Sequence, residues 1–190
     1  MSAHPRTIGS VLCFCLLVAA SPFALSQAAA APKPAVGTAI APAQVYGKLL
    51  SSMEAEIVGL AEAMPEDKYS FVPTQGEFKT VRSFGDQIKH VAETNAYFFH
   101  DPTQPLADTR GDIEKLKTKA EIVKALKESF VQAHAYVDSI TPENAFVMTA
   151  TGTRAGMAAF GMAHFMDHYG QLVVYLRMNG IVPPASRGSM

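Results

Sequence analysis

Prolines divide this chain into long stretches in which apolar residues recur at helical spacing. Pro65, Pro102, Pro142 and Pro183 stand at the ends of these stretches. Within them apolar residues return every three or four positions, which is the spacing of one helix face, and no stretch reads convincingly as a strand. Proline interrupts a helix interior, so each one limits how far a helix extends. The chain is therefore expected to be all-α.

Four helices are predicted, and their ends carry recognisable signals. Thr118 and Glu121 form a capping-box pattern, and Gly180 followed by prolines is a typical helix stop. The predicted ranges are Ala43–Ala63, Val81–Phe99 with Ser83 as a cap, Thr118–Ile140 and Arg154–Gly180. Helices of this length, joined by several long connections, predict a four-helix bundle.

The N-terminal segment has the pattern of a secretory signal peptide. Arg6 precedes an uncharged run over Ile8–Ala20, and small residues follow. We expect cleavage after Ala28 and export to the periplasm or the exterior. The alternative is a retained membrane anchor, but the run is shorter than the roughly 20 residues needed to span a bilayer.

The predicted organisation is therefore a sequence of four parts. A signal peptide over residues 1–28 precedes an Ala/Pro-rich linker over 29–42, a helical domain over 43–184 and a short tail over 185–190.

Composition excludes several kinds of chemistry. Cys13 and Cys15 both lie in the signal segment, so the mature chain would have no disulfide, thiolate ligand or cysteine nucleophile. The net charge is -1, and no Lys/Arg cluster with interleaved aromatic residues is present, which argues against a nucleic-acid partner. Chemistry must use histidine, carboxylate or hydroxyl groups, or a bound cofactor.

His164 and His168 are candidate metal ligands on the last predicted helix. Residues four apart lie above one another on a helix, and Met157, Phe160 and Tyr175 continue their stripe, so it should face the interior. Buried imidazoles need partners, and a divalent ion would bind both. Such pairs are common, and this one lacks the glutamate of the zinc-protease His-Glu-x-x-His motif.

His90 is the third candidate. It lies at the border of the apolar arc of the second predicted helix, a position less natural for a core residue than for a ligand between helices. The alternative is an exposed surface histidine. Tyr97 and Gln171 fall near the candidate ligands along their stripes, where they could orient a metal-bound water or hydrogen-bond to the ligands. Ordinary interior hydrogen bonding is the alternative for both.

Three segments resemble one known family in order and spacing. They are MPEDKYSFVPT, VRSFGDQIKHVAETNAYFF and AHFMDHYGQLVVYLRMNGIVPP. They resemble the DinB-like (DinB/YfiT) superfamily of metalloenzymes, over most of Val45–Pro184. The resemblance implies a four-helix bundle with a three-histidine site for a divalent metal such as zinc, nickel or iron. The matching ligand positions are His90, His164 and His168.

Three neutral imidazoles leave a fourth coordination position open, which is typical of catalytic sites. We expect an exported metal-binding protein with a small-molecule substrate. An open position suits a metal-dependent hydrolase, and the resemblance to the DinB-like superfamily implies a thiol-dependent transferase as the other activity. Low-molecular-weight thiols are scarce outside the cytoplasm, which argues against the transferase. Asp167 is expected to point away from the histidines, so a base for the hydrolase is not evident. The alternatives are a non-enzymatic metal or small-ligand binding module and a structural dimeric helical bundle.

Small residues line another face of the last predicted helix. Gly156, Ala159, Ala163 and Gly170 would let a second helix approach closely. Packing within the bundle is the preferred interpretation, and a homodimer contact is the alternative.

Overall fold

The computed structural model describes residue 1 and residues 33–105 and 110–188, so the predicted signal peptide lies outside the described residues apart from its first residue. The helical unit begins at Ala39. Its α-helices are α1 (Pro42–Ala63), α2 (Phe84–Phe98), α3 (Arg110–Glu114), α4 (Lys119–Asp138) and α5 (Arg154–Met178), with 3-10 turns η1 (Glu66–Lys68) and η2 (Pro184–Ser186). The described residues contain one isolated bridge, between Met148 and Thr153, and no strand. The all-α prediction is confirmed.

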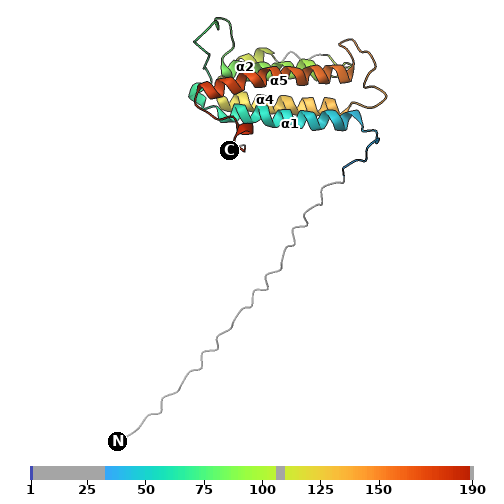
Figure 1. The fold of residues 1–190 in the computed structure, drawn as a ribbon, viewed down its shortest axis with the longest axis horizontal. Coiled ribbons are helices and arrows are strands. Elements are labelled where there is room, and N and C mark those ends of the chain that lie inside the picture. The colour runs from blue at the N-terminus through green and yellow to red at the C-terminus, as the bar shows by residue number, and fades with distance from the viewer. Residues whose placement is uncertain (2–32, 106–109, 189–190) are drawn as a thin grey trace. The chain divides into compact units, whose positions relative to one another are not determined.

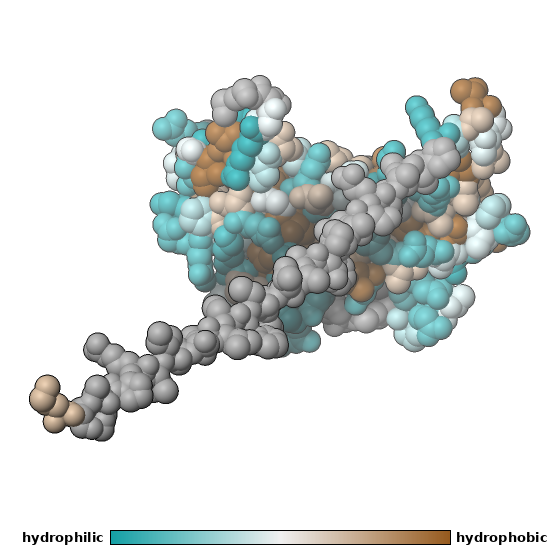
Figure 2. Space-filling view, turned by 90° about the horizontal axis from the view of Figure 1, so that it is seen from below, coloured by the Kyte–Doolittle hydropathy of each residue, from teal (hydrophilic) through white to brown (hydrophobic). Residues whose placement is uncertain are grey.

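The four long helices contact one another in a closed ring. Helix α1 packs against α4 and α5, and α2 packs against the same two helices (Figure 1). This is the neighbour pattern of a four-helix bundle. The interior is filled by apolar side chains such as Phe84, Phe130 and Phe165, all 0% exposed. On the face seen in Figure 2, hydrophobic patches lie among hydrophilic residues. Among the described helices, none is both long and apolar enough to span a membrane.

Side chains fix the helix ends. The Ser83 hydroxyl accepts a hydrogen bond from the Asp86 amide at 3.2 Å, so α2 starts at Phe84, three residues later than predicted. The predicted capping box is confirmed, with the Glu121 amide 3.2 Å from the Thr118 hydroxyl and the reciprocal bond at 3.0 Å. At the other end of the chain, Gly180 has φ 73°, a left-handed conformation that glycine adopts easily. These caps satisfy backbone groups that a helix leaves unpaired.

The structure corrects three details of the apolar pattern. Val45 and Leu49, which belong to the predicted repeat of the first helix, are 44% and 45% exposed, and Leu50 is buried instead. Phe160, predicted to face the interior, is 62% exposed. The spacing of apolar residues shows which face of a helix points inward. How much of the helix surface around that face is buried depends on the neighbouring helices. The short helix α3 was not predicted.

The small residues of α5 do not pack within the bundle. Gly156, Ala159, Ala163 and Gly170 are all exposed, so the preferred interpretation is wrong. The reason is that α1 and α2, the ring neighbours of α5, cover its other sides. A homodimer contact over this face stays a prediction.

Gly161 is the small residue that does permit close packing. A Cβ atom added there would lie 2.8 Å from Cζ of Phe99 and 2.9 Å from Cβ of Phe98. Real Cβ atoms do not approach other atoms so closely, so the end of α2 can rest on α5 only because residue 161 has no side chain.

Gly161→Ala should therefore destabilise the protein, whereas Gly170→Ala should not. Overpacking at Gly161 is expected to lower the free energy of unfolding by about 1–3 kcal/mol. Gly170 is in the same helix, and a Cβ there meets nothing within 4 Å, so alanine should raise stability by about 0.5–1 kcal/mol. Urea denaturation measures both. Equal stability of the two variants would contradict the close contact.

Candidate metal centre

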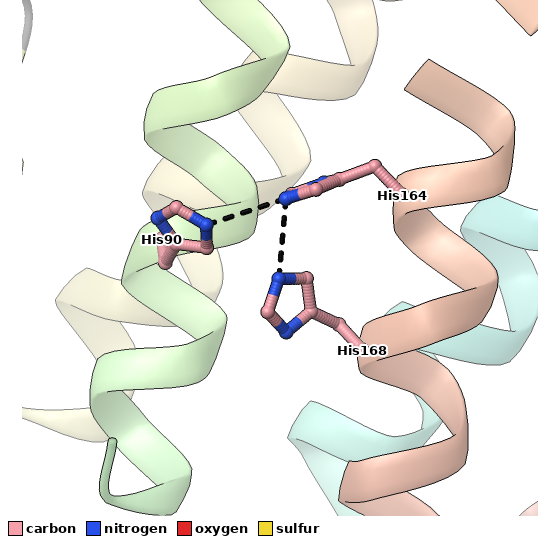
Figure 3. Close-up of side chains that lie close together, drawn as sticks. All are labelled: His90, His164 and His168. Carbon is pink, nitrogen blue, oxygen red and sulfur yellow. Dashed lines mark hydrogen bonds between the residues drawn. The ribbon is translucent and has the colours of Figure 1, made fainter. Parts of the chain in front are cut away.

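Helices α2 and α5 bring the three predicted histidines together. His90 comes from α2, and His164 and His168 come from successive turns of α5 (Figure 3). The Nε2 atom of His164 lies 3.3 Å from Nε2 of His90 and 3.1 Å from Nε2 of His168. The three residues form a group whose ligand atoms all lie within 4.8 Å of one another. This group could hold a metal ion.

The nitrogen spacing suits an ion. Zinc–nitrogen bonds of about 2.0–2.1 Å at tetrahedral angles place ligand nitrogens about 3.3 Å apart. The two Nε2 distances at His164 are 3.3 and 3.1 Å. Without an ion, the lone pair of His164 Nε2 can accept only one hydrogen bond, from either His90 or His168. In the remaining close pair of nitrogens two lone pairs face each other and repel. A cation shared by all three nitrogens resolves this conflict, so the donor set fits a divalent metal.

Each ring has a polar neighbour at its other nitrogen, and all three neighbours are on α2. Oε1 of Gln87 is 3.0 Å from Nδ1 of His168, and Oγ1 of Thr94 is 3.5 Å from Nδ1 of His164. Oε2 of Glu93 is 4.0 Å from Nδ1 of His90. Outer partners of this kind orient metal-bound imidazoles.

Thr94 can accept from His164 because its own hydrogen is used elsewhere. Its hydroxyl donates to the His90 carbonyl at 2.8 Å. The Nδ1 atoms are therefore suited to carry protons and the Nε2 atoms to offer lone pairs to the shared point.

Gln87 is a site residue that the sequence interpretation did not single out. It is 1% exposed and stands one turn before His90. The signal available in the sequence was an amide one turn from a candidate ligand, on the same stripe of the helix. The pattern of α2 alone could not show that Gln87 lies opposite His168.

Burial keeps the imidazoles neutral. It lowers the pKa of His90 and of His168 to about 4, with smaller contributions from the Arg82 guanidinium and the neighbouring rings. The pKa of His164 is lowered by the same main cause. Neutral imidazole is the form that binds metals, so the site needs little or no deprotonation at neutral pH.

Within the described part of the chain, neither Tyr97 nor Gln171 forms a hydrogen bond to the three histidines. Tyr97 is 49% exposed, and its ring meets Phe98 edge-on at 5.3 Å. Gln171 donates from Nε2 to Oδ2 of Asp167 at 3.3 Å, and Asp167 is exposed. A role for either residue toward a metal-bound water stays a prediction.

The depressed histidine pKa values predict a pH-dependent stability of the metal-free protein. Unfolded histidine takes up a proton near pH 6.5, but folded His90 and His168 do so only near pH 4. The unfolded state therefore binds more protons between these values, and the free energy of unfolding should fall as pH drops from about 6.5 to about 4. Ring-proton NMR titration would measure both groups directly. Titration of either ring near pH 6.5 would contradict the depression of its pKa by burial.

A comparison with known protein families identifies the family of this chain. The model of the DinB superfamily matches residues 49–172, a range that contains all three histidines and lies within the predicted helical domain. No curated protein matches the chain significantly. Because the match covers more than half of the sequence, the chain belongs to the DinB superfamily.

Proposed function

We propose that this protein binds one divalent metal ion through His90, His164 and His168, and that the ion is the working centre of an exported enzyme. The convergence of three Nε2 atoms at spacings of 3.1 and 3.3 Å carries the proposal. The neutral state of the rings and the outer partners on α2 support it, because both prepare imidazole for a cation.

An enzyme is favoured over a closed binding module by the number of ligands. Among the described residues, the group able to hold an ion contains three histidines and no carboxylate. The fourth position of a tetrahedral ion is then left for water or substrate. The His90 side chain is 22% exposed, which gives this position access to solvent. A binding module would close it with a protein ligand.

The charge balance indicates what the fourth ligand is. Three neutral imidazoles carry no negative charge to compensate that of a divalent ion. Of the charged groups nearby, the Arg82 guanidinium lowers the pKa of all three rings, and the Asp167 carboxylate opposes it at His164 and His168. An anionic ligand such as hydroxide or thiolate is therefore favoured. A bound divalent ion lowers the pKa of coordinated water or thiol, which is the chemistry of a hydrolase or of a thiol-dependent transferase.

Metal content tests the proposal. The purified wild-type protein should carry about one divalent ion per chain, and His90→Ala and His168→Ala should each lose most of it, since two imidazoles hold an ion weakly. Inductively coupled plasma mass spectrometry measures content, and thermal denaturation with and without chelator measures the coupled stability.

His134→Ala is the matched control for this experiment. His134 is also partly buried in a helix, but its Nε2 lies 2.7 Å from Oε2 of Glu54, away from the three-histidine group. This variant should keep its metal. Retention of metal by His90→Ala and His168→Ala would contradict the ligand assignment.

We also propose that the protein is exported. The support is the charged start, the apolar run over Ile8–Ala20 and the small residues up to Ala28. Expression of the full chain in a bacterium should give a periplasmic product whose N-terminal sequencing starts at Ala29. An intact N-terminus in the cytoplasmic fraction would contradict export without affecting the metal proposal.

A further inference from the structure

We propose that Gln87 is a positioning residue that holds His168 in the Nδ1–H tautomer and so directs its Nε2 lone pair to the metal. The importance of this tautomer rests on the proposed metal-binding function. The tautomer itself is a property of the metal-free protein. It can therefore be measured separately from metal binding, and the test below does so.

The Gln87–His168 contact is closed to water. Gln87 is 1% exposed and His168 is 5% exposed, and Oε1 of Gln87 lies 3.0 Å from Nδ1 of His168. An amide oxygen can only accept a hydrogen bond, so Nδ1 must be the donor. A neutral imidazole carries a proton on only one of its two ring nitrogens. Nε2 of His168 therefore keeps a free lone pair, and it lies 3.1 Å from Nε2 of His164.

The orientation of the Gln87 amide follows from its other neighbour, Tyr175. The Tyr175 hydroxyl donates to the Arg82 carbonyl at 3.2 Å, so its oxygen is left to accept. Nε2 of Gln87 reaches full hydrogen-bond geometry with none of the described residues. The Gln87 side chain nevertheless interacts with Tyr175: burial raises the pKa of the phenol, and the smaller effect of Gln87 lowers it.

An amide turned the other way would place its oxygen against the phenol oxygen. It would also place its NH2 group against Nδ1 of His168, and the imidazole would then carry its proton on Nε2, where the ion is to bind. The Tyr175–Arg82 bond therefore favours the amide orientation that keeps Nε2 of His168 free, the orientation in which Oε1 of Gln87 lies 3.0 Å from Nδ1 of His168.

Gln87 makes the strongest of the three outer contacts. Its distance of 3.0 Å compares with 3.5 Å for Thr94 and 4.0 Å for Glu93, and hydrogen bonds weaken steeply over this range. Among the three partners, removal of Gln87 should have the largest effect on the site.

The experiment compares Gln87→Leu, which removes the acceptor, with Gln87→Glu, which keeps an oxygen there. In the metal-free protein, the ring ¹⁵N chemical shifts of His168 should show Nδ1–H in the wild type and in Gln87→Glu, and a shift toward Nε2–H in Gln87→Leu. Competition with a chromogenic chelator should show zinc binding weakened about 10–100-fold in Gln87→Leu, and about as tight as wild type or tighter in Gln87→Glu.

Asn95→Leu is the matched control. Asn95 is a buried amide of the same helix, 0% exposed, but it donates to Oγ of Ser129 at 2.8 Å and to none of the histidines. This variant should keep both the wild-type tautomer and the wild-type zinc affinity, whatever its stability. Gln87→Met, which also lacks the acceptor, replaces Gln87→Leu if the latter does not fold.

The tautomer of His168 in the metal-free protein is the measurement that tests the positioning role of Gln87. A wild-type His168 protonated on Nε2, or Nδ1–H unchanged in Gln87→Leu, would overturn it. Failure of the wild-type protein to bind zinc or another divalent ion would instead overturn the proposed function, and a tautomer that depends on Gln87 would still support the positioning contact. The wild-type tautomer requires no variant, so it is measurable in every case.

Discussion

The close approach of α2 and α5 is the contact on which both the fold and the candidate centre depend. Because Gly161 has no side chain, Phe98 and Phe99 can pack directly against α5 at this position. His164 follows one turn later on the same helix. The ring of Phe98 also lies 5.1 Å from the ring of His164. A wider spacing of the two helices would leave the pair on α5 intact but would move His90 out of reach. The spacing of 3.3 Å between Nε2 of His90 and Nε2 of His164 is thus a consequence of packing.

The two helices contribute differently to the centre. Helix α5 supplies two imidazoles from a largely apolar helix, and α2 supplies the third imidazole together with Gln87, Glu93 and Thr94. Burial makes the rings poor bases, and that same burial would be costly if their nitrogens had no partners. One arrangement therefore removes the protons that would compete with a metal and orients the lone pairs that are proposed to bind it.

The features that depend on a single helix can be predicted from the sequence. The spacing of His164 and His168, the Thr118 capping box and the border position of His90 follow from the helical period, and the resemblance of the segments around them indicated that the three act together. Gln87 was missed because its role depends on the residue opposite. Phe160 and the small residues of α5 were misplaced for a related reason, since the period cannot show how much of a helix its neighbours cover. The short helix α3 has too few residues for a periodic pattern.

The arrangement of the ring also bears on the open coordination position proposed for the ion. One source of a fourth protein ligand, which would close the site, is α1 or α4, the two helices that complete the ring. Two polar groups of these helices with suitable donor atoms, Glu54 and His134, instead lie 2.7 Å from each other, and neither belongs to the three-histidine group. The ligands come from one pair of neighbouring helices, and His90 remains partly exposed. If the proposed ion is bound, the partial exposure of His90 would let a fourth ligand exchange with solvent, as a reaction requires and a purely structural metal site does not.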